Sequence, residues 1–247
     1  MLVDNKFIYI SIPRCATTSF LVSCFKNKID VKHFDNRFDF DYQLNNNDFI
    51  KTITDIEELS NNLKHCHEPL PLLESKFGKN YDIISVRRNR YERFISSWKH
   101  CIHEIIRSGD TETANILKKL DENQILDFNA EILQTDNIKN PNKFSQIFID
   151  KFKLKSNSKY LNEVFFSVFI PTSYTHQNNN KIIWFDFNEL DRMEEWVSEK
   201  LNKNFKLVKS NSSNKIDCNL KLTENFIKKY NSIYDRFEII KNEKSIL

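Results

Sequence analysis

A short polar segment near the start of the chain combines a cation with three hydroxyl side chains. It consists of Pro13, Arg14, Cys15, Ala16, Thr17, Thr18 and Ser19. An apolar, β-branched run at residues 7 to 12 precedes it, and apolar residues at helical spacing follow from Thr18, with Thr17 or Thr18 as a suitable N-cap. Such a strand-to-helix loop directs backbone N–H groups and the helix dipole at one point. We expect it to bind a phosphate or sulfate, although a capped helix start would use the same residue types for structure alone.

Four arginines cluster where a second predicted strand, residues 81 to 86, leads into a helix. They are Arg87, Arg88, Arg90 and Arg93. Ligands of α/β proteins bind at the carboxyl ends of parallel strands, so Arg88 at the strand tip and Ser96 two turns into the helix could hold one phosphate. The alternative is an exposed basic helix start. Arginines early in a helix oppose its dipole, which favours an anion that balances them.

Two histidines, His65 and His67, lie between these segments in a His-x-His pattern. Imidazole titrates near neutrality, with a pKa of about 6.5, and therefore suits a general base. By itself the pattern is also typical of a surface or metal-binding coincidence. A third metal ligand at helpful spacing does not accompany it in the sequence, and we expect no metal.

Together the three segments resemble the sulfotransferases that use 3′-phosphoadenosine 5′-phosphosulfate (PAPS). The first is similar to their 5′-phosphosulfate loop, Pro-Lys-x-x-x-Thr-(Ser or Trp). The second is similar to their 3′-phosphate motif, Arg-(Asn or Asp)-Pro-x-x-Arg-x-x-Ser-x-Tyr, with Arg88, Arg93 and Ser96 at its fixed positions. The His-x-His pair resembles that of the heparan sulfate and uronyl 2-O-sulfotransferases, so the resemblance is greatest to the carbohydrate branch.

This resemblance implies a P-loop-like sulfotransferase fold, in which helices flank a central, mostly parallel β-sheet. It implies PAPS as co-substrate, 3′-phosphoadenosine 5′-phosphate as product, and a hydroxyl acceptor on a carbohydrate or small alcohol. His67 would be the catalytic base, His65 a supporting catalytic residue and Arg14 a catalytic cation at the leaving group. The implied nucleotide-binding residues are Arg14, Cys15, Ala16, Thr17, Thr18, Ser19, Arg88 and Ser96.

Three positions depart from the family pattern, because Arg14 replaces Lys, Arg90 replaces Pro and Trp98 replaces Tyr. The chain also has only two glycines, so positions that normally favour glycine must be filled by other residues. Weaker similarities extend toward the C-terminus in residues 171–174, 187–190 and 230–237. Residues 211–213 and Lys215 could belong to a loop that closes over the nucleotide, or to an ordinary polar loop.

Strands alternate with helices along the chain, which predicts an α/β layer fold with a largely parallel sheet. The predicted strands cover residues 7–12, 81–86 and 181–185, with a further candidate at 205–208. The predicted helices cover residues 18–25, 50–65, 91–105, 110–155 with a break at Asn140-Pro141, 190–201 and 223–240. Repeats and linker-like composition are absent from the sequence, so we expect a single domain over residues 1–247.

The composition excludes several classes of protein. Hydrophobic residues make up 40% and charged residues 29%, which is typical of a globular chain and not of a disordered one. A net charge of +3 from 37 basic and 34 acidic residues gives no reason to expect bulk nucleic-acid or membrane binding. The sequence has no run of 18 apolar residues, no signal-peptide pattern and five cysteines without C-x-x-C pairing, which predicts a soluble protein of the reducing cytoplasm.

Two other functions stay open from the residues alone. A strand, loop and helix around a phosphate is also typical of small-molecule kinases, although the sequence lacks G-x-x-x-x-G-K-[ST] and carries the Arg88/Ser96 pair. A non-catalytic anion- or polysaccharide-binding module on the same fold is the other alternative, because Arg14 and Arg90 depart from the catalytic pattern.

Overall fold

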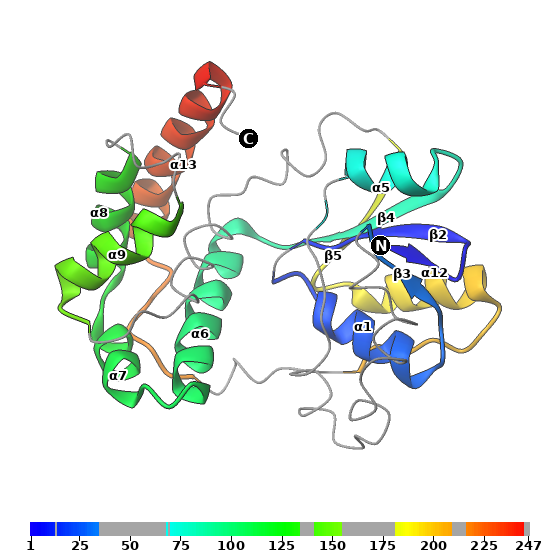
Figure 1. The fold of residues 1–247 in the computed structure, drawn as a ribbon, viewed down its shortest axis with the longest axis horizontal. Coiled ribbons are helices and arrows are strands. Elements are labelled where there is room, and N and C mark those ends of the chain that lie inside the picture. Colours follow the sequence, from blue (N-terminus) through cyan, green and yellow to red (C-terminus); the bar gives the residue numbers. More distant parts are fainter. Residues whose placement is uncertain are drawn as a thin grey trace. The chain divides into compact units, whose positions relative to one another are not determined.

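The computed structural model describes residues 1–12, 14–34, 68, 70–133, 141–154, 181–208 and 216–244. These residues form an α/β fold in which helices flank a five-stranded mixed sheet (Figure 1). The chain divides into two compact units, one made of Met1–Arg88 with Thr172–Ser210 and the other of Asn89–Pro171 with Asn211–Leu247. Whether the whole chain acts as the single domain that we expect stays a prediction.

The sheet of the first unit has the strand order β3-β1-β2-β4-β5. Its strands are β1 (Leu2–Val3), β2 (Phe7–Ile10), β3 (Val31–Lys32), β4 (Asp82–Arg87) and β5 (Ile182–Asp186). The pairs β2–β4 and β4–β5 are parallel, whereas β1 is antiparallel to both β2 and β3. The expected mostly parallel sheet is therefore a mixed one, because a hairpin at the start of the chain adds an antiparallel strand to the parallel core.

The two faces of the sheet are covered by different helices. On β2, Phe7 and Tyr9 pack into the cluster that includes α1 (Thr17–Lys26) and α12 (Leu190–Leu201), as expected for side chains that alternate across a strand. Ile8 and Ile10 pack on the opposite face with α5 (Leu70–Phe77). Figure 1 shows α1 and α12 on one side of the strands and α5 on the other. Burial on both faces explains why the parallel strands are continuous apolar runs.

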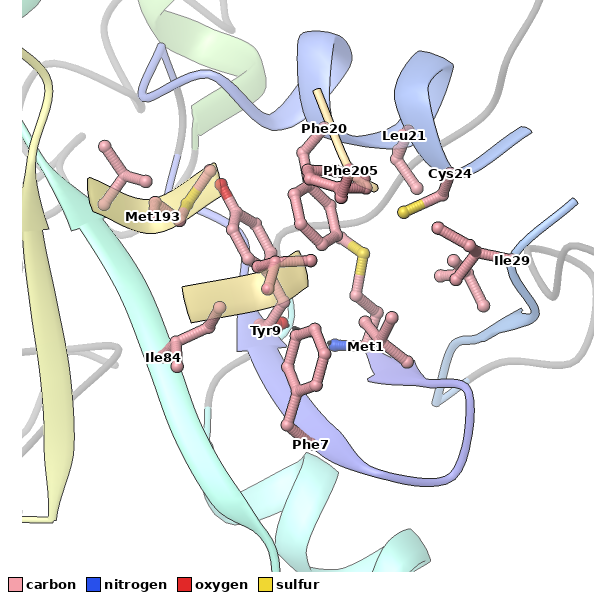
Figure 2. Packing of buried hydrophobic residues seen from close by; sticks show 14 of the residues in the cluster. Met1, Phe7, Tyr9, Phe20, Leu21, Cys24, Ile29, Ile84, Met193 and Phe205 are labelled. Atoms are coloured by element: carbon pink, nitrogen blue, oxygen red, sulfur yellow. Dashed lines mark hydrogen bonds between the residues drawn. The ribbon is translucent and has the colours of Figure 1, made fainter. Parts of the chain in front are cut away.

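Aromatic side chains fill the core under α1 (Figure 2). Tyr9 stacks on Phe20 with ring centroids 4.1 Å apart and an interplanar angle of 8°, and Phe205 packs on Phe20 at 5.5 Å. Met1, Phe7 and Cys24 surround these rings and are at most 1% exposed. Since the Tyr9 hydroxyl also donates to the Cys15 carbonyl oxygen at 3.3 Å, this core holds the loop that precedes α1.

The second unit is helical where the structure describes it. It contains α6 (Arg90–Arg107), α7 (Thr111–Lys119), α8 (Glu122–Leu133), α9 (Pro141–Phe152) and α13 (Glu224–Lys244). Its buried cluster includes Phe94 and Trp98 of α6 with Phe226 and Tyr230 of α13, which confirms the apolar stripes predicted for both helices. The predicted break at Asn140-Pro141 is also confirmed, because α9 begins at the proline, where a missing N–H costs nothing.

Most predicted elements are confirmed within one or two residues, and four features differ. The helical stretch predicted from residue 110 has a further break, because α7 ends at Lys119 and α8 begins at Glu122. Residues 205–208 form no strand, because their backbone groups bond to side chains: Phe205 N donates to Ser198 Oγ at 3.0 Å and Val208 N to Ser23 Oγ at 2.7 Å. The short strands β1 and β3 were not predicted, nor was α5. The predicted helix at residues 50–65 lies outside the described residues. Among the helices that are described, none combines the length and the apolar character that crossing a bilayer requires.

Candidate functional site

The loop between β2 and α1 has a strained backbone that is suited to an anion. Arg14 and Ala16 both have φ of 63°, in the left-handed region where a residue with a Cβ is disfavoured. Ala16 is the N-cap of α1 and is followed at once by the right-handed helix. Alternation of left- and right-handed residues turns successive N–H groups toward one side and forms a concave anion-binding surface. The loop therefore presents N–H donors at the positive end of α1.

The prediction that Thr17 or Thr18 caps the helix is wrong. Ala16 occupies the cap position, and alanine has no side-chain acceptor with which to satisfy the first N–H groups of α1. The Thr17 hydroxyl is instead buried, accepts from Ser11 Oγ at 2.9 Å and donates to the Ile12 carbonyl oxygen at 3.2 Å. The hydroxyl proton of Thr17 is therefore donated within the loop. The side chains of Thr18 and Ser19 are partly exposed. Cys15 is buried, and its N–H donates to the Ile12 carbonyl oxygen at 3.2 Å.

The end of β4 lies beside this loop in the sheet. β2 and β4 are parallel neighbours, and the buried Ser85 hydroxyl donates to the Ile10 carbonyl oxygen at 2.9 Å where β2 ends. Beyond β4, Nη1 of Arg88 lies 3.5 Å from the Arg14 carbonyl oxygen. The structure thus brings together Arg14 and Arg88, one from each of the two segments that the sequence singled out.

The third parallel strand supplies an aromatic support for Arg88. Phe187 follows β5, and its ring centroid lies 4.2 Å from Cζ of Arg88, which is a cation–π contact. The Phe187 N–H donates to the Arg87 carbonyl oxygen at 2.8 Å and fixes the ring at the end of the strand. The sequence indicated Phe187 only as part of residues 187–190, and its contact with Arg88 was not predicted. No local pattern reveals a contact between residues so far apart in sequence.

Arg87 has a different role from its neighbour. It is exposed and makes a two-point ion pair with Asp186, with Nε 2.6 Å from Oδ1 and Nη2 3.0 Å from Oδ2. This hydrogen-bonded pair raises the pKa of Arg87 and lowers the pKa of Asp186 from their usual values. Arg87 is therefore neutralised by a strand neighbour.

The rest of the arginine-rich segment belongs to the second unit. Arg90 donates through Nη2 to Asn231 Oδ1 at 2.8 Å, and its Cζ lies 5.2 Å from the Tyr91 ring and 5.0 Å from the Tyr234 ring. Arg90, which stands where the sulfotransferase motif has proline, thus places its guanidinium beside two tyrosine rings and an asparagine amide. Arg90 therefore has partners within the second unit, and an anion that balances its charge stays a prediction.

Arg93 is buried, with 5% of its surface exposed. It neighbours Tyr230, where burial raises the pKa to about 12 while the Arg93 charge acts in the opposite direction. Ser96 is partly exposed on α6, and Trp98, which replaces the family tyrosine, is fully buried in the helical core. Since Arg88 ends the first unit and Ser96 belongs to the second, a phosphate site shared by the two stays a prediction.

The predicted catalytic residues His65 and His67 lie outside the described residues, as do residues 171–174, 211–213 and Lys215. Glu68, which follows His67 in the sequence, is described and buried. Its Oε1 accepts from Phe34 N at 2.6 Å, and its Oε2 lies 3.7 Å from His33 Nδ1. Burial by itself would raise the pKa of Glu68, but the interaction with His33 and the positive charge of the Met1 amino group outweigh burial and lower the pKa.

Glu68 is attached near the same edge of the sheet as the loop. β3 runs in the direction of β2, because both are antiparallel to β1, so His33 and Phe34 follow the carboxyl end of β3. In addition, Glu68 Oε2 lies 3.8 Å from the Met1 nitrogen, which donates to the Tyr9 carbonyl oxygen of β2 at 2.9 Å. The carboxyl edge of the first unit thus carries Glu68, Arg14, Arg88 and Phe187 on four different segments.

Buried nucleophiles of the first unit are not suited to chemistry. Burial raises the pKa of the Tyr9 hydroxyl and of the Cys24 thiol well above their usual values. Both groups stay protonated at neutral pH and act as core residues. The edge therefore offers cations and N–H donors, which are groups that can bind an anion.

A second set of polar residues, on α6, was not singled out from the sequence. His100, His103 and Glu104 offer ligand atoms that all lie within 4.8 Å of one another. Their H-x-x-H-E spacing puts them on one helix face and was the signal that could have found them.

Comparison of the chain with protein-family models, with curated proteins and with solved structures found no match to any of them.

Proposed function

We propose that this chain is a sulfotransferase that moves a sulfuryl group from PAPS to a hydroxyl group, most simply that of a carbohydrate or small alcohol, and that its first unit has the P-loop-like sulfotransferase fold. The observation that carries the proposal is the contact of the Arg88 guanidinium with the Arg14 carbonyl, 3.5 Å apart, at the carboxyl ends of two parallel strands. It joins the two segments that resemble the 5′-phosphosulfate loop and the 3′-phosphate motif.

The charge arrangement supports a ligand with anions at both ends. The Arg14 side chain, the left-handed loop and the start of α1 provide one cationic and N–H-rich surface. Arg88, stacked on Phe187, provides a guanidinium whose orientation is restricted before any ligand binds. A nucleotide with a 5′-phosphosulfate and a 3′-phosphate matches two such sites better than a nucleotide phosphorylated only at the 5′ position does.

Each residue then has a role in an in-line transfer. His67 takes the proton of the acceptor oxygen as that oxygen attacks sulfur, with His65 in support, and the bond from sulfur to the bridging phosphate oxygen breaks. Arg14 and the N–H groups of residues 16–19 stabilise the negative charge that develops on the leaving phosphate, whereas the Cys15 N–H donates to the Ile12 carbonyl oxygen. Arg88 holds the 3′-phosphate, and Ser96 is the second residue that the sequence resemblance implies for it. Glu68, which directly follows His67, lies near this edge of the sheet, and this position supports the assignment.

Ligand-dependent stabilisation tests the nucleotide part of the proposal. Adenosine 3′,5′-bisphosphate should raise the unfolding temperature far more than ATP or 5′-AMP at equal concentration, since only the bisphosphate engages both sites. A larger shift with ATP would favour a small-molecule kinase instead. Bisphosphate binding without a sulfated product, when labelled PAPS is supplied with a panel of glycans and small alcohols and products are weighed by mass spectrometry, would indicate a non-catalytic binding module.

Substitution of the base tests the chemical part. His67→Ala should lower the turnover of PAPS by about 100-fold or more, because a positioned base contributes about 10²–10⁴-fold. Its affinity for the bisphosphate should be unchanged, which separates loss of the base from loss of folding. A His67→Ala protein with wild-type turnover would remove His67 from this role.

A further inference from the structure

We propose that one turn of α6 binds a zinc ion through His100, His103 and Glu104. This site belongs to the second unit and does not depend on the proposed sulfuryl transfer. The three residues are the first, fourth and fifth of the run His-Cys-Ile-His-Glu, and this spacing places their side chains on one face of a helix. The intervening Cys101 and Ile102 are buried in the helical core.

The distances suit a small cation with tetrahedral coordination. Glu104 Oε1 lies 3.2 Å from His103 Nδ1 and 4.0 Å from His100 Nδ1, so one carboxylate oxygen faces both imidazole rings. Zinc bonds to nitrogen and oxygen are about 2.0–2.2 Å long, which puts two ligands of a tetrahedral ion about 3.4 Å apart. Small side-chain rotations would therefore bring all three atoms to bonding distance.

Burial and ligand type favour zinc over the hard cations. The Glu104 side chain is only 9% exposed and that of His103 14%, whereas that of His100 is 34% exposed. A metal ion there would have three protein ligands on its inner side and solvent on its outer side, where water can complete the coordination. Two imidazoles with one carboxylate match zinc, while magnesium and calcium prefer oxygen ligands alone.

In this structure Arg107 is paired with the Glu104 carboxylate. Its Nη1 lies 3.2 Å from Oε1 and 3.1 Å from Oε2 of Glu104, so the guanidinium balances the buried carboxylate. The Arg107 side chain is 45% exposed and can turn toward solvent. Zinc and Arg107 then compete for the same carboxylate, which gives the site a distinctive response to substitution.

Zinc titration of the full-length protein against a chromophoric chelator, after removal of metals by dialysis, tests the proposal. We expect one zinc ion per chain and no binding of magnesium in the same assay. Glu104→Gln and His100→Ala should each weaken zinc binding at least about tenfold, since even residues outside the ligand set change zinc affinity by about 10–100-fold. Arg107→Ala should tighten it by about 3- to 10-fold, because a nearby positive charge is removed.

Two further variants keep the outcome decisive. The double variant His65→Ala/His67→Ala should keep full zinc affinity, and loss of binding there would assign the ion to the His-x-His pair and overturn the proposal. Unchanged affinity in His100→Ala and Glu104→Gln would overturn it as well, as would weaker binding in Arg107→Ala. Circular dichroism of each variant identifies any loss that comes from unfolding. Sulfated product formation is not part of the readout, so this proposal and the proposed function can fail separately.

Discussion

The two helices that begin after the arginine-bearing segments start in opposite ways. At α1 the N-cap is Ala16 in the left-handed region, and the first turn, Thr17 to Phe20, has no carboxylate. At α6 the N-cap is Asn89, whose Oδ1 accepts from Tyr91 N at 3.0 Å and Glu92 N at 3.4 Å, and Glu92 adds a negative charge in the first turn. The start of α6 is thus satisfied by its own side chains, whereas the start of α1 offers donors to a ligand.

This difference separates two uses of positive charge. At α1 the positive end of the helix dipole and Arg14 lie in one loop, and Arg88 reaches that loop from the end of the neighbouring strand. At α6 the Asn89 cap and Glu92 satisfy the helix start, and Arg90 binds Asn231 within its own unit. Of the arginines in the second segment, Arg88, the residue that precedes the cap, is therefore the one that the proposed phosphate site depends on most.

The largest expected effect comes from Arg88. Arg88→Gln should weaken the binding of adenosine 3′,5′-bisphosphate by about 10- to 100-fold, because a hydrogen bond to a charged group contributes about 1.5–3 kcal/mol. Arg87→Gln is the matched control, and it should change the affinity less than about threefold, since Arg87 is exposed and paired with Asp186. Isothermal titration calorimetry of both variants measures the contrast.

Phe187 should also contribute to the affinity for the bisphosphate, through its contact with Arg88. Phe187→Leu keeps an apolar side chain but removes the ring 4.2 Å from Arg88, and a cation–π contact contributes about 0.5–2 kcal/mol. Its effect on affinity should therefore lie between those of Arg87→Gln and Arg88→Gln. Equal affinities of Arg87→Gln and Arg88→Gln for the bisphosphate would contradict this prediction. They would mean that Arg88 contributes no more to nucleotide binding than the ion-paired Arg87 does.

A smaller effect on stability is expected at Asn89. Asn89→Ala removes the cap of α6 and should lower the free energy of unfolding by about 1 kcal/mol, whereas Asn89→Asp keeps an acceptor and should stay near wild type. Urea unfolding followed by circular dichroism measures the difference. If both variants were equally destabilised, the carboxamide of Asn89 would be needed for something other than capping.

The sequence predicted well what depends on local pattern. The apolar runs at residues 7–12 and 81–86, each followed by a helical stripe, predicted β2, α1, β4 and α6. The strand tip also predicted that Arg88 would lie near the first segment, because parallel neighbours end at one edge. The two-residue strands β1 and β3 were missed, since two residues are too few to show a period.

The side-chain partners could not be predicted because they are distant in sequence. Arg87 meets Asp186 across 99 residues and Arg90 meets Asn231 across 141. The helix dipole predicts a single bound anion that balances all four arginines. In the structure Arg87 pairs with Asp186, Arg88 lies at the end of a strand, Arg90 binds Asn231 and Arg93 is buried beside Tyr230. Only these tertiary contacts distinguish the four residues.

The smallest expected effect tests the strained loop itself. Ala16 has φ of 63°, which costs a residue with a Cβ about 1–2 kcal/mol, and Ala16→Gly would relieve that cost while adding about 0.4–1 kcal/mol of unfolded-state entropy. The variant should therefore be as stable as wild type or more stable by up to about 1 kcal/mol. Ala130→Gly, in the right-handed helix α8, should lose about 1 kcal/mol for the opposite reason.

Thermal unfolding of the two variants side by side gives opposite signs if the loop is left-handed at Ala16. Equal losses in both would show that Ala16 has ordinary helical geometry, in which case the N–H groups at the start of α1 would not converge on one point. A stabilised Ala16→Gly would show that the native loop carries backbone strain at Ala16, which glycine relieves.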